Sequence, residues 1–211
     1  MAPAIRTFIT APAIALAIAA LAACGADKDG SAGADANHAT GADGGPIAKL
    51  FPEDFKGVCS GASVSAATAY DPAGTAHKAV YLATYKDDFL DQSSSLPNDW
   101  TVQFTPDKDA YQAVDLVVCA RRTAQRELKI CDGYKDDGKP TQNKVRWHTA
   151  TYELSVHEAR TGKKLGEKTA EATDSDCPMF MNFDGTSDTV DAYASLPDST
   201  VADFLRPHMK R

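Results

Sequence analysis

The chain contains five cysteines, at positions 24, 59, 119, 131 and 177, and this odd number strongly constrains what it can fold into. Cys24 stands apart because it directly follows an apolar stretch near the N-terminus. The other four form an even set, as expected for a domain cross-linked by two disulfides. No cysteines show the Cys-x-x-Cys spacing of zinc sites, so we expect no metal site.

The first 23 residues have the pattern of a secretory signal peptide. Arg6 is the only charge before Asp27, and residues 7–23 are apolar apart from two threonines. This run is slightly short for a transmembrane helix, which needs about 20 apolar residues, and Pro12 interrupts it. We therefore expect a signal peptide over residues 1–23.

The end of this stretch, Leu21-Ala22-Ala23-Cys24, resembles the lipobox of bacterial lipoproteins. In that family the cysteine thiol receives a diacylglyceryl group, and the chain is cut just before the cysteine. The resemblance implies that Cys24 is lipidated and anchors the chain in membrane lipid, on the extracytoplasmic face of the cell membrane. Two or three acyl chains hold firmly, since each buried CH₂ contributes about 0.8 kcal/mol.

Composition divides the remaining chain into a tether and one domain. Residues 25–46 are almost entirely Gly, Ala, Asp, Ser and Asn, and such a segment buries too little surface to offset the entropy of ordering. We expect a lipidated, flexible tether over 24–46 and a single globular domain over 47–211. The net charge of −7 argues against nucleic acid as a partner.

Hydrophobic alternation predicts an α+β fold, with a mainly antiparallel β-sheet, one or two flanking helices and disulfide bonds. The clearest hairpin is 144–172, in which a turn at Gly162 joins two strands. A closing helix over 199–205 is expected to stop at Pro207, and a short helix over 47–55 to break near Pro52. The other expected strands are 78–85, 100–104, 113–122 and 127–134, with 177–183 as a short strand or buried loop.

Four cysteines allow three pairings. Cys119 and Cys131 fall in segments that read as adjacent strands joined by a short loop, so the sequence favours the pair Cys119–Cys131. Cys59–Cys177 follows by elimination and would tie the start of the domain to its end.

Motifs for chemistry are weak, and we name no catalytic residue and no cofactor. The string Gly57-Val58-Cys59-Ser60-Gly61 lacks the spacing of a hydrolase nucleophile elbow. Residues 132–139, DGYKDDGK, lack the ligands of a calcium loop at positions 3 and 12 and therefore read as a hairpin turn. His157, with Glu153 and Ser155, is expected in an exposed row on one strand face.

Trp147 leaves two alternatives open. Strict alternation puts Val145 and Trp147 on the face opposite Tyr152 and Leu154. Either the strand is bulged, or Trp147 lies on the outer face, where it would indicate a binding surface.

Several motifs recur together between residues 77 and 206. They are LVVC (116–119), KIC (129–131), YELSVHEARTGKKL (152–165), Cys177-Pro178 and VADFLRP (201–207). This set resembles an uncharacterised domain of bacterial exported and membrane proteins. Because that family has no established activity, the resemblance implies a scaffold and no site residues.

We therefore expect a membrane-anchored lipoprotein that binds an envelope protein or ligand without catalysis. A hydrolase acting on envelope polymers is the alternative. A transporter's solute-binding protein fits less well because it usually needs two lobes, and the domain is too short for that.

Overall fold

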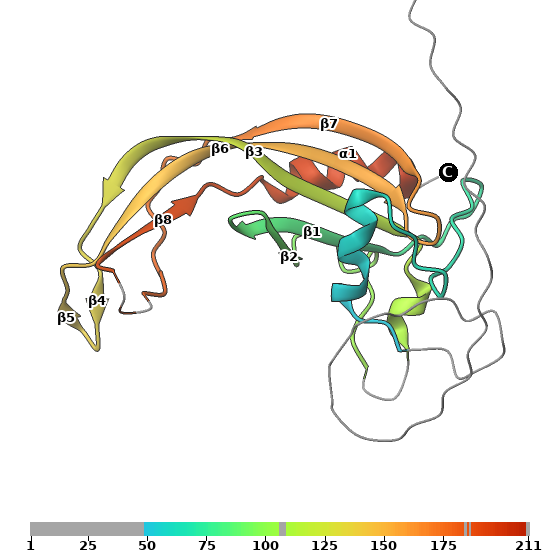
Figure 1. Ribbon diagram of the computed structural model, residues 1–211, viewed down its shortest axis with the longest axis horizontal. Helices are drawn as coiled ribbons and strands as arrows, with labels where there is room; N and C mark the ends of the chain where they lie inside the picture. Colours follow the sequence, from blue (N-terminus) through green and yellow to red (C-terminus); the bar gives the residue numbers. More distant parts are fainter. Residues whose placement is uncertain (1–48, 106–108, 184, 186, 210–211) are drawn as a thin grey trace, which may run out of the picture. The chain divides into compact units, whose positions relative to one another are not determined.

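The computed structural model describes residues 49–105, 109–183, 185 and 187–209. The expected signal peptide, Cys24 and the whole of the expected tether lie outside these residues. In chain order the elements are the 3-10 helix η1 (Pro52–Ser60), β1 (Ala79–Lys86), β2 (Phe89–Gln92), the 3-10 helix η2 (Ala110–Ala113), β3 (Leu116–Cys131), β4 (Lys135–Asp136), β5 (Lys139–Pro140), β6 (Lys144–Glu158), β7 (Lys164–Ala172), β8 (Thr189–Tyr193) and α1 (Asp198–Met209) (Figure 1).

Six strands form one sheet, in the order β2-β1-β3-β6-β7, with β8 also paired to β6. The β1–β3 and β6–β8 pairs are parallel, and the β1–β2, β3–β6 and β6–β7 pairs are antiparallel. β7 and β8 lie along the same edge of β6, β7 beside residues 150–157 and β8 beside residues 144–148. The expected α+β fold with a mainly antiparallel sheet, flanking helices and disulfides is confirmed.

The longest pairing joins β3 to β6, from Leu116 opposite Glu158 to Cys131 opposite Val145. Both strands bend along their length (Figure 1). The register shifts twice on β3, between Arg122 and Ala124 and between Glu127 and Lys129. Such bulges bend a strand and increase its twist, so they account for the curvature of this pair.

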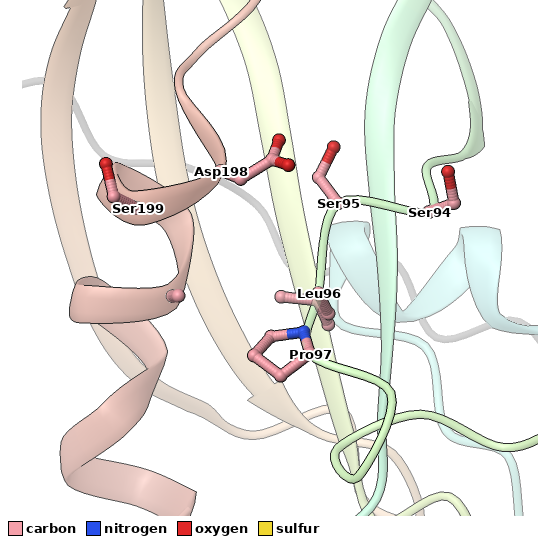
Figure 2. A pocket seen from close by; sticks show the side chains of 7 residues that line it. Ser94, Ser95, Leu96, Pro97, Asp198 and Ser199 are labelled. Atoms are coloured by element: carbon pink, nitrogen blue, oxygen red, sulfur yellow. The ribbon is translucent and has the colours of Figure 1, made fainter.

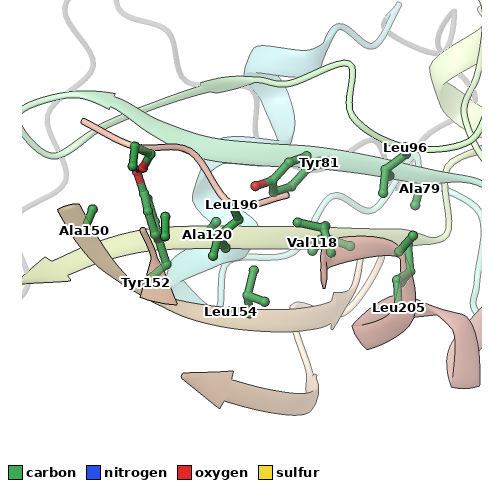
Figure 3. Packing of buried hydrophobic residues seen from close by; sticks show 14 of the residues in the cluster. Ala79, Tyr81, Leu96, Val118, Ala120, Ala150, Tyr152, Leu154, Leu196 and Leu205 are labelled. Atoms are coloured by element: carbon green, nitrogen blue, oxygen red, sulfur yellow. Dashed lines mark hydrogen bonds between the residues drawn. The ribbon is translucent and has the colours of Figure 1, made fainter. Parts of the chain in front are cut away.

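The first half of the ladder is buried on both faces. Leu116, Val118 and Ala120 of β3 share a core with Leu205 of α1, and Tyr81 and Leu154 pack among them (Figure 3). The alternate residues Val117 and Cys119 face a second core, which contains Phe55 and Val58 of η1. The sheet is therefore covered by α1 on one face and by η1 on the other, and the apolar run LVVC is buried on both.

The second half of the ladder is covered on one face. Residues 123–130 of β3 are all exposed, whereas Val145, Trp147 and Ala150 of β6 are buried in the same core as α1. Trp147 is only 7% exposed, and its indole N–H donates to the carbonyl oxygen of Asp174 at 2.9 Å. The bulge on β3 between Glu127 and Lys129 lies opposite Trp147. Neither alternative for Trp147 is right: the indole belongs to the core, and β6 pairs with β3 without skipping a residue, since the extra residues of both bulges lie on β3.

The β6–β7 hairpin has the predicted turn at Gly162, where φ is +74°. The turn packs directly on the chain that follows η1, so a Cβ at this position would overlap the carbonyl oxygens of Gly61 and Ala62. The predicted hairpin in 132–139 is also present, because β4 pairs with β5 around Asp137 and Gly138, which both have positive φ.

Several local predictions are wrong, among them the break between strands 113–122 and 127–134, which is absent because β3 is continuous over Leu116–Cys131. Residues 100–104 form no strand, although Trp100 is buried there. Pro52 begins η1 instead of breaking a helix, since the first helical position needs no backbone N–H donor. α1 runs through Pro207 to Met209, although a proline there lacks the N–H that would donate to the carbonyl oxygen of Asp203.

The predicted disulfide pairing is also wrong. Cys59 bonds to Cys119, and Cys131 bonds to Cys177. Cys119 and Cys131 lie near opposite ends of the same strand, β3. At about 3.3 Å per residue their α-carbons are roughly 40 Å apart along an extended strand, far beyond the span of a disulfide.

Substituting Gly162 tests the close approach of the hairpin turn. In the control Gly133→Ala, the new Cβ meets open space, so the only expected loss of stability is that of a side chain at φ +83°. We expect this loss to be about 1–2 kcal/mol in the free energy of unfolding. Gly162→Ala adds the overlap with Gly61 and Ala62, so we expect a further loss of about 1–3 kcal/mol in the free energy of unfolding. Urea unfolding of the two variants measures the difference, and equal losses would contradict the packing described.

The disulfide pairing is tested by proteolysis of the unreduced protein followed by mass spectrometry. We expect cross-linked peptides that join Cys59 to Cys119 and Cys131 to Cys177. A peptide pair joining Cys119 to Cys131 would show that β3 is not one continuous strand.

Candidate functional site

Of the four histidines within the described residues, His77 is held in a buried hydrogen-bonded pair with Asp115. Its Nδ1 lies 2.6 Å from Asp115 Oδ2, and its Nε2 lies 3.0 Å from the carbonyl oxygen of Gly74. The second carboxylate oxygen of Asp115 accepts the backbone N–H of Lys78. Both partners of the ring are oxygens, one of a carboxylate and one of a backbone carbonyl. The arrangement fastens the chain before β1 to the start of β3 and leaves neither ring nitrogen for catalysis.

His157 is buried rather than exposed, so the expected exposed row is wrong. It is 3% exposed and Ser155 is 6% exposed, while Glu153 of the same strand is at the surface. Ser155 Oγ lies 3.0 Å from His157 Nε2, and the carbonyl oxygen of Gly162 lies 3.2 Å from Nδ1. His157 therefore braces the β6–β7 turn.

His208 is partly buried near the end of α1, and burial lowers the pKa of its imidazole. Its backbone carbonyl accepts the hydroxyl of Tyr70 at 3.3 Å. No acid group orients this ring in the hydrogen bonds of the described residues, so His208 lacks the arrangement of a catalytic base.

The remaining histidine, His148, belongs to a polar cluster where β8 joins β6. Asp191 accepts a two-point hydrogen bond from the Arg146 guanidinium, at 2.7 and 2.6 Å, and lies 2.8 Å from His148 Nε2. The hydrogen bond from Arg146 is the main cause that lowers the pKa of Asp191 to about 2, and His148 adds to it against the opposing effect of burial. This network ties the parallel strand β8 to β6.

Arg122 extends the cluster toward β1. Its guanidinium lies 3.5 Å from the ring centre of Tyr193, and its Nη2 donates to the carbonyl oxygen of Asp87 in the β1–β2 turn. Tyr152 donates its hydroxyl hydrogen bond to the carbonyl oxygen of Ala194 at 2.9 Å. Burial raises the pKa of Tyr152, and Arg122 acts in the opposite direction.

The cluster contains the buried polar atoms that lack a hydrogen-bond partner among the described residues. They are Nη1 of Arg122 and Nδ1 of His148. A His–Asp pair can support hydrolysis if its other ring nitrogen meets a nucleophile. Here that nitrogen is His148 Nδ1, which is buried and meets no hydroxyl. The cluster thus orders β8 and the β1–β2 turn, and it does not assemble a reaction centre.

Two depressions open on the surface, and both are small. One, about 290 Å³, lies between the start of α1 and the segment after β2, with Asp198 and Ser95 on its two walls and Leu96 and Pro97 at its base (Figure 2). The other, about 300 Å³, is lined by His77, Trp100 and Met209 among others. Neither brings together charged groups in a way that specifies a ligand.

A different feature projects from the second half of the ladder. We call residues 178–180 the apolar tip, Pro178-Met179-Phe180. Met179 is 86% exposed and Phe180 is 89% exposed. The sequence predicted a strand or buried loop over 177–183, and the tip corrects that prediction because its two largest side chains point to solvent.

The chain on both sides of the apolar tip is fixed to the domain. Cys177 is bonded to Cys131 at the end of β3, and the Tyr134 hydroxyl donates to the carbonyl oxygen of Pro178 at 3.0 Å. After the tip, Phe183 packs edge-on against the Tyr134 ring at 5.4 Å. The tip is therefore presented by a braced loop, which lowers the conformational entropy lost on binding.

The structure assigns the cysteines of the domain to the two disulfides, and Cys24 falls outside the described residues. Within 49–209, apart from the gaps in the description, no three His, Cys, Asp or Glu side chains gather as a metal site. No described helix has the length and apolar character to cross a bilayer. Comparisons with protein-family models, with curated proteins and with solved structures find no match to this chain.

The Arg146–Asp191–His148 network makes stability depend on pH. Asp191 has a folded-state pKa of about 2, below the unfolded value of about 3.9, so its ionised form stabilises the fold above about pH 4. That contribution is lost as the pH falls through about 2. We expect Asp191→Asn to be less stable than the unmodified protein at pH 7, with a difference that shrinks below pH 4. Urea unfolding at pH 7, 4 and 3 checks this, with Asp88→Asn as an exposed control, and a constant difference would contradict it.

Proposed function

We propose that the chain is an exported lipoprotein, anchored through Cys24, that works as a binding module of the cell envelope without catalysis. The observation that carries the proposal is which cysteines form disulfides and which one does not. The two disulfides take up Cys59, Cys119, Cys131 and Cys177, so Cys24 is the cysteine outside them. It is also the one that ends the lipobox-like sequence.

The disulfides support an extracytoplasmic location. Structural disulfides form and persist in oxidising compartments and are rare in the cytosol, where thiols are kept reduced. Cys119 is fully buried, and the bond to Cys59 lies in the core between β3 and η1. A bond buried in this way belongs to the folded scaffold, so the scaffold itself fits a compartment outside the cytoplasm.

The placement of the histidines supports binding over hydrolysis of envelope polymers. His77 and His157 use both ring nitrogens in contacts that hold the fold. His148 keeps a buried Nδ1 that meets no nucleophile. The exposed apolar tip, in contrast, is available to a partner.

Labelling with radioactive palmitate tests the anchor. Cells that produce the full chain are expected to incorporate label into the protein and to yield a mature form beginning at Cys24. Cys24→Ser is expected to lose the label completely because serine has no thiol to acylate. Ser31→Ala, which leaves the lipobox-like sequence intact, is the matched control and is expected to keep the label.

Absence of label in the unmodified protein, or equal label in Cys24→Ser, would overturn the lipoprotein proposal. The mass of the mature protein gives an independent reading, because loss of residues 1–23 and gain of acyl chains both change it.

A further inference from the structure

We infer that the apolar tip, residues 178–180, is the contact surface for a protein partner, and that the partner offers an apolar pocket rimmed by basic side chains. The inference rests on the proposed function only in placing the partner in the cell envelope. It is carried by the exposure of Met179 and Phe180, the bracing of their loop and the charge of the residues around them.

Exposure alone would say little, because single apolar residues are common on protein surfaces. Here two large side chains are adjacent and each is more than four-fifths exposed, at 86% and 89%. Aromatic residues and methionine are enriched at protein interfaces, where an aromatic side chain often anchors in a pocket. Methionine adapts its shape to the surface that receives it.

The bracing distinguishes the tip from a loose loop. The disulfide Cys131–Cys177 and the hydrogen bond from Tyr134 to the carbonyl oxygen of Pro178 fix the chain before Met179. Met181 and Phe183, just after the tip, are partly buried against the core. Among the apolar side chains of 178–183, Met179 and Phe180 are thus the exposed ones, while Pro178, Met181 and Phe183 are partly buried.

Charge points to the kind of partner. Within the described stretch 173–183 there are two aspartates, Asp174 and Asp176, and no Lys or Arg. Asp174 and Asp176 are exposed and form no ion pair with another described residue. We call these two aspartates the acidic rim, and an apolar contact next to them is complementary to an apolar pocket next to basic side chains.

The same charge disfavours the other occupants. Insertion of the tip into an anionic bilayer would bring carboxylates to a negative surface, whereas membrane-binding segments carry Lys and Arg there. A second copy of this chain brings a net charge of −7 and the same acidic rim, so self-association through two tips is opposed by like charge.

The test places a photoreactive amino acid, p-benzoylphenylalanine, at position 180 of the full chain in the cells that produce it. We expect irradiation to give one discrete protein adduct whose cross-linked peptide from the partner combines apolar residues with Lys or Arg. The matched control carries the same group at Tyr85, which is 73% exposed on β1, and is expected to give no such adduct.

Two further variants, made with the group at position 180, test the acidic rim. Asp176→Lys with Asp174→Asn raises the charge by three, and the asparagine keeps the side-chain oxygen that accepts the N–H of residue 176. We expect the adduct to fall about tenfold or more. Glu53→Lys with Asp88→Asn makes the same charge change at exposed positions elsewhere and is expected to leave the adduct unchanged. Retention of both disulfides in each variant shows that it is folded.

Each remaining outcome overturns the inference. An adduct of twice the protein's mass would identify a second copy, and adducts with lipid alone would identify the bilayer. No adduct at position 180, an equal adduct at position 85, or indifference to the charge of the rim would remove the tip as the contact surface. Palmitate labelling reports on the anchor independently, so failure of the tip and failure of the lipoprotein proposal are distinguishable.

Discussion

The antiparallel ladder between β3 and β6 is the interaction on which the other elements depend. β1 pairs with the free side of β3, and β7 and β8 divide the free side of β6 between them. α1 and η1 pack on opposite faces of its first half. The ladder curves because β3 carries two bulges. The same pair of strands therefore has one half that is covered on both faces and one half that is covered on one face.

The two halves of the ladder are stabilised by different means. The first half has apolar layers on both faces, and Cys59–Cys119 links η1 to β3 within them. The second half lacks the second layer, and there Cys131–Cys177, the Trp147 indole and the Asp191 network hold the loop and β8 in place. In the chain-entropy model, closing a loop of 46 residues stabilises a fold by about 4 kcal/mol.

The edge of β3 beyond β1 shows how an extended strand is kept from aggregating. Pairing with β1 ends at Ala120, and Thr84 closes it by accepting the N–H of Arg122 with its hydroxyl oxygen. The stretch 123–130 then carries Arg, Glu and Lys side chains and a bulge. Charged residues and bulges are the features that discourage edge-to-edge pairing with other chains.

The sequence predicted the fold class and most elements because alternation and turn residues are local signals. β1, β6, β7 and the Gly162 turn all follow from patterns of a few residues. The polar middle of β3 defeats this reasoning, since 121–128 has neither apolar alternation nor Gly or Pro to mark a turn. The sequence indicates a break between two strands there, and the wrong disulfide pairing follows from that predicted break. Only the partner strand β6, equally long, makes such a polar segment a strand.

The same limit explains why the apolar tip was not predicted. Residues 177–183 are as apolar as a core strand, and which of them turn inward depends on Tyr134, Cys131 and the end of β3, all distant in the sequence. Met181 and Phe183 pack against the core, whereas a local pattern would assign burial to the whole segment.

What a small domain can recognise depends on what it leaves unburied. The polar side chains that could take part in catalysis form hydrogen bonds that hold neighbouring segments in place. They are His77, His157, Asp115 and Asp191. The two depressions, about 290 and 300 Å³, lie at the lower end of the range of small-molecule sites. Binding sites usually lie in a cavity of the protein. With the braced apolar tip the arrangement is the opposite, because the pocket belongs to the partner. Recognition through the tip needs no cavity in this domain, and it leaves the β3–β6 ladder undisturbed on binding.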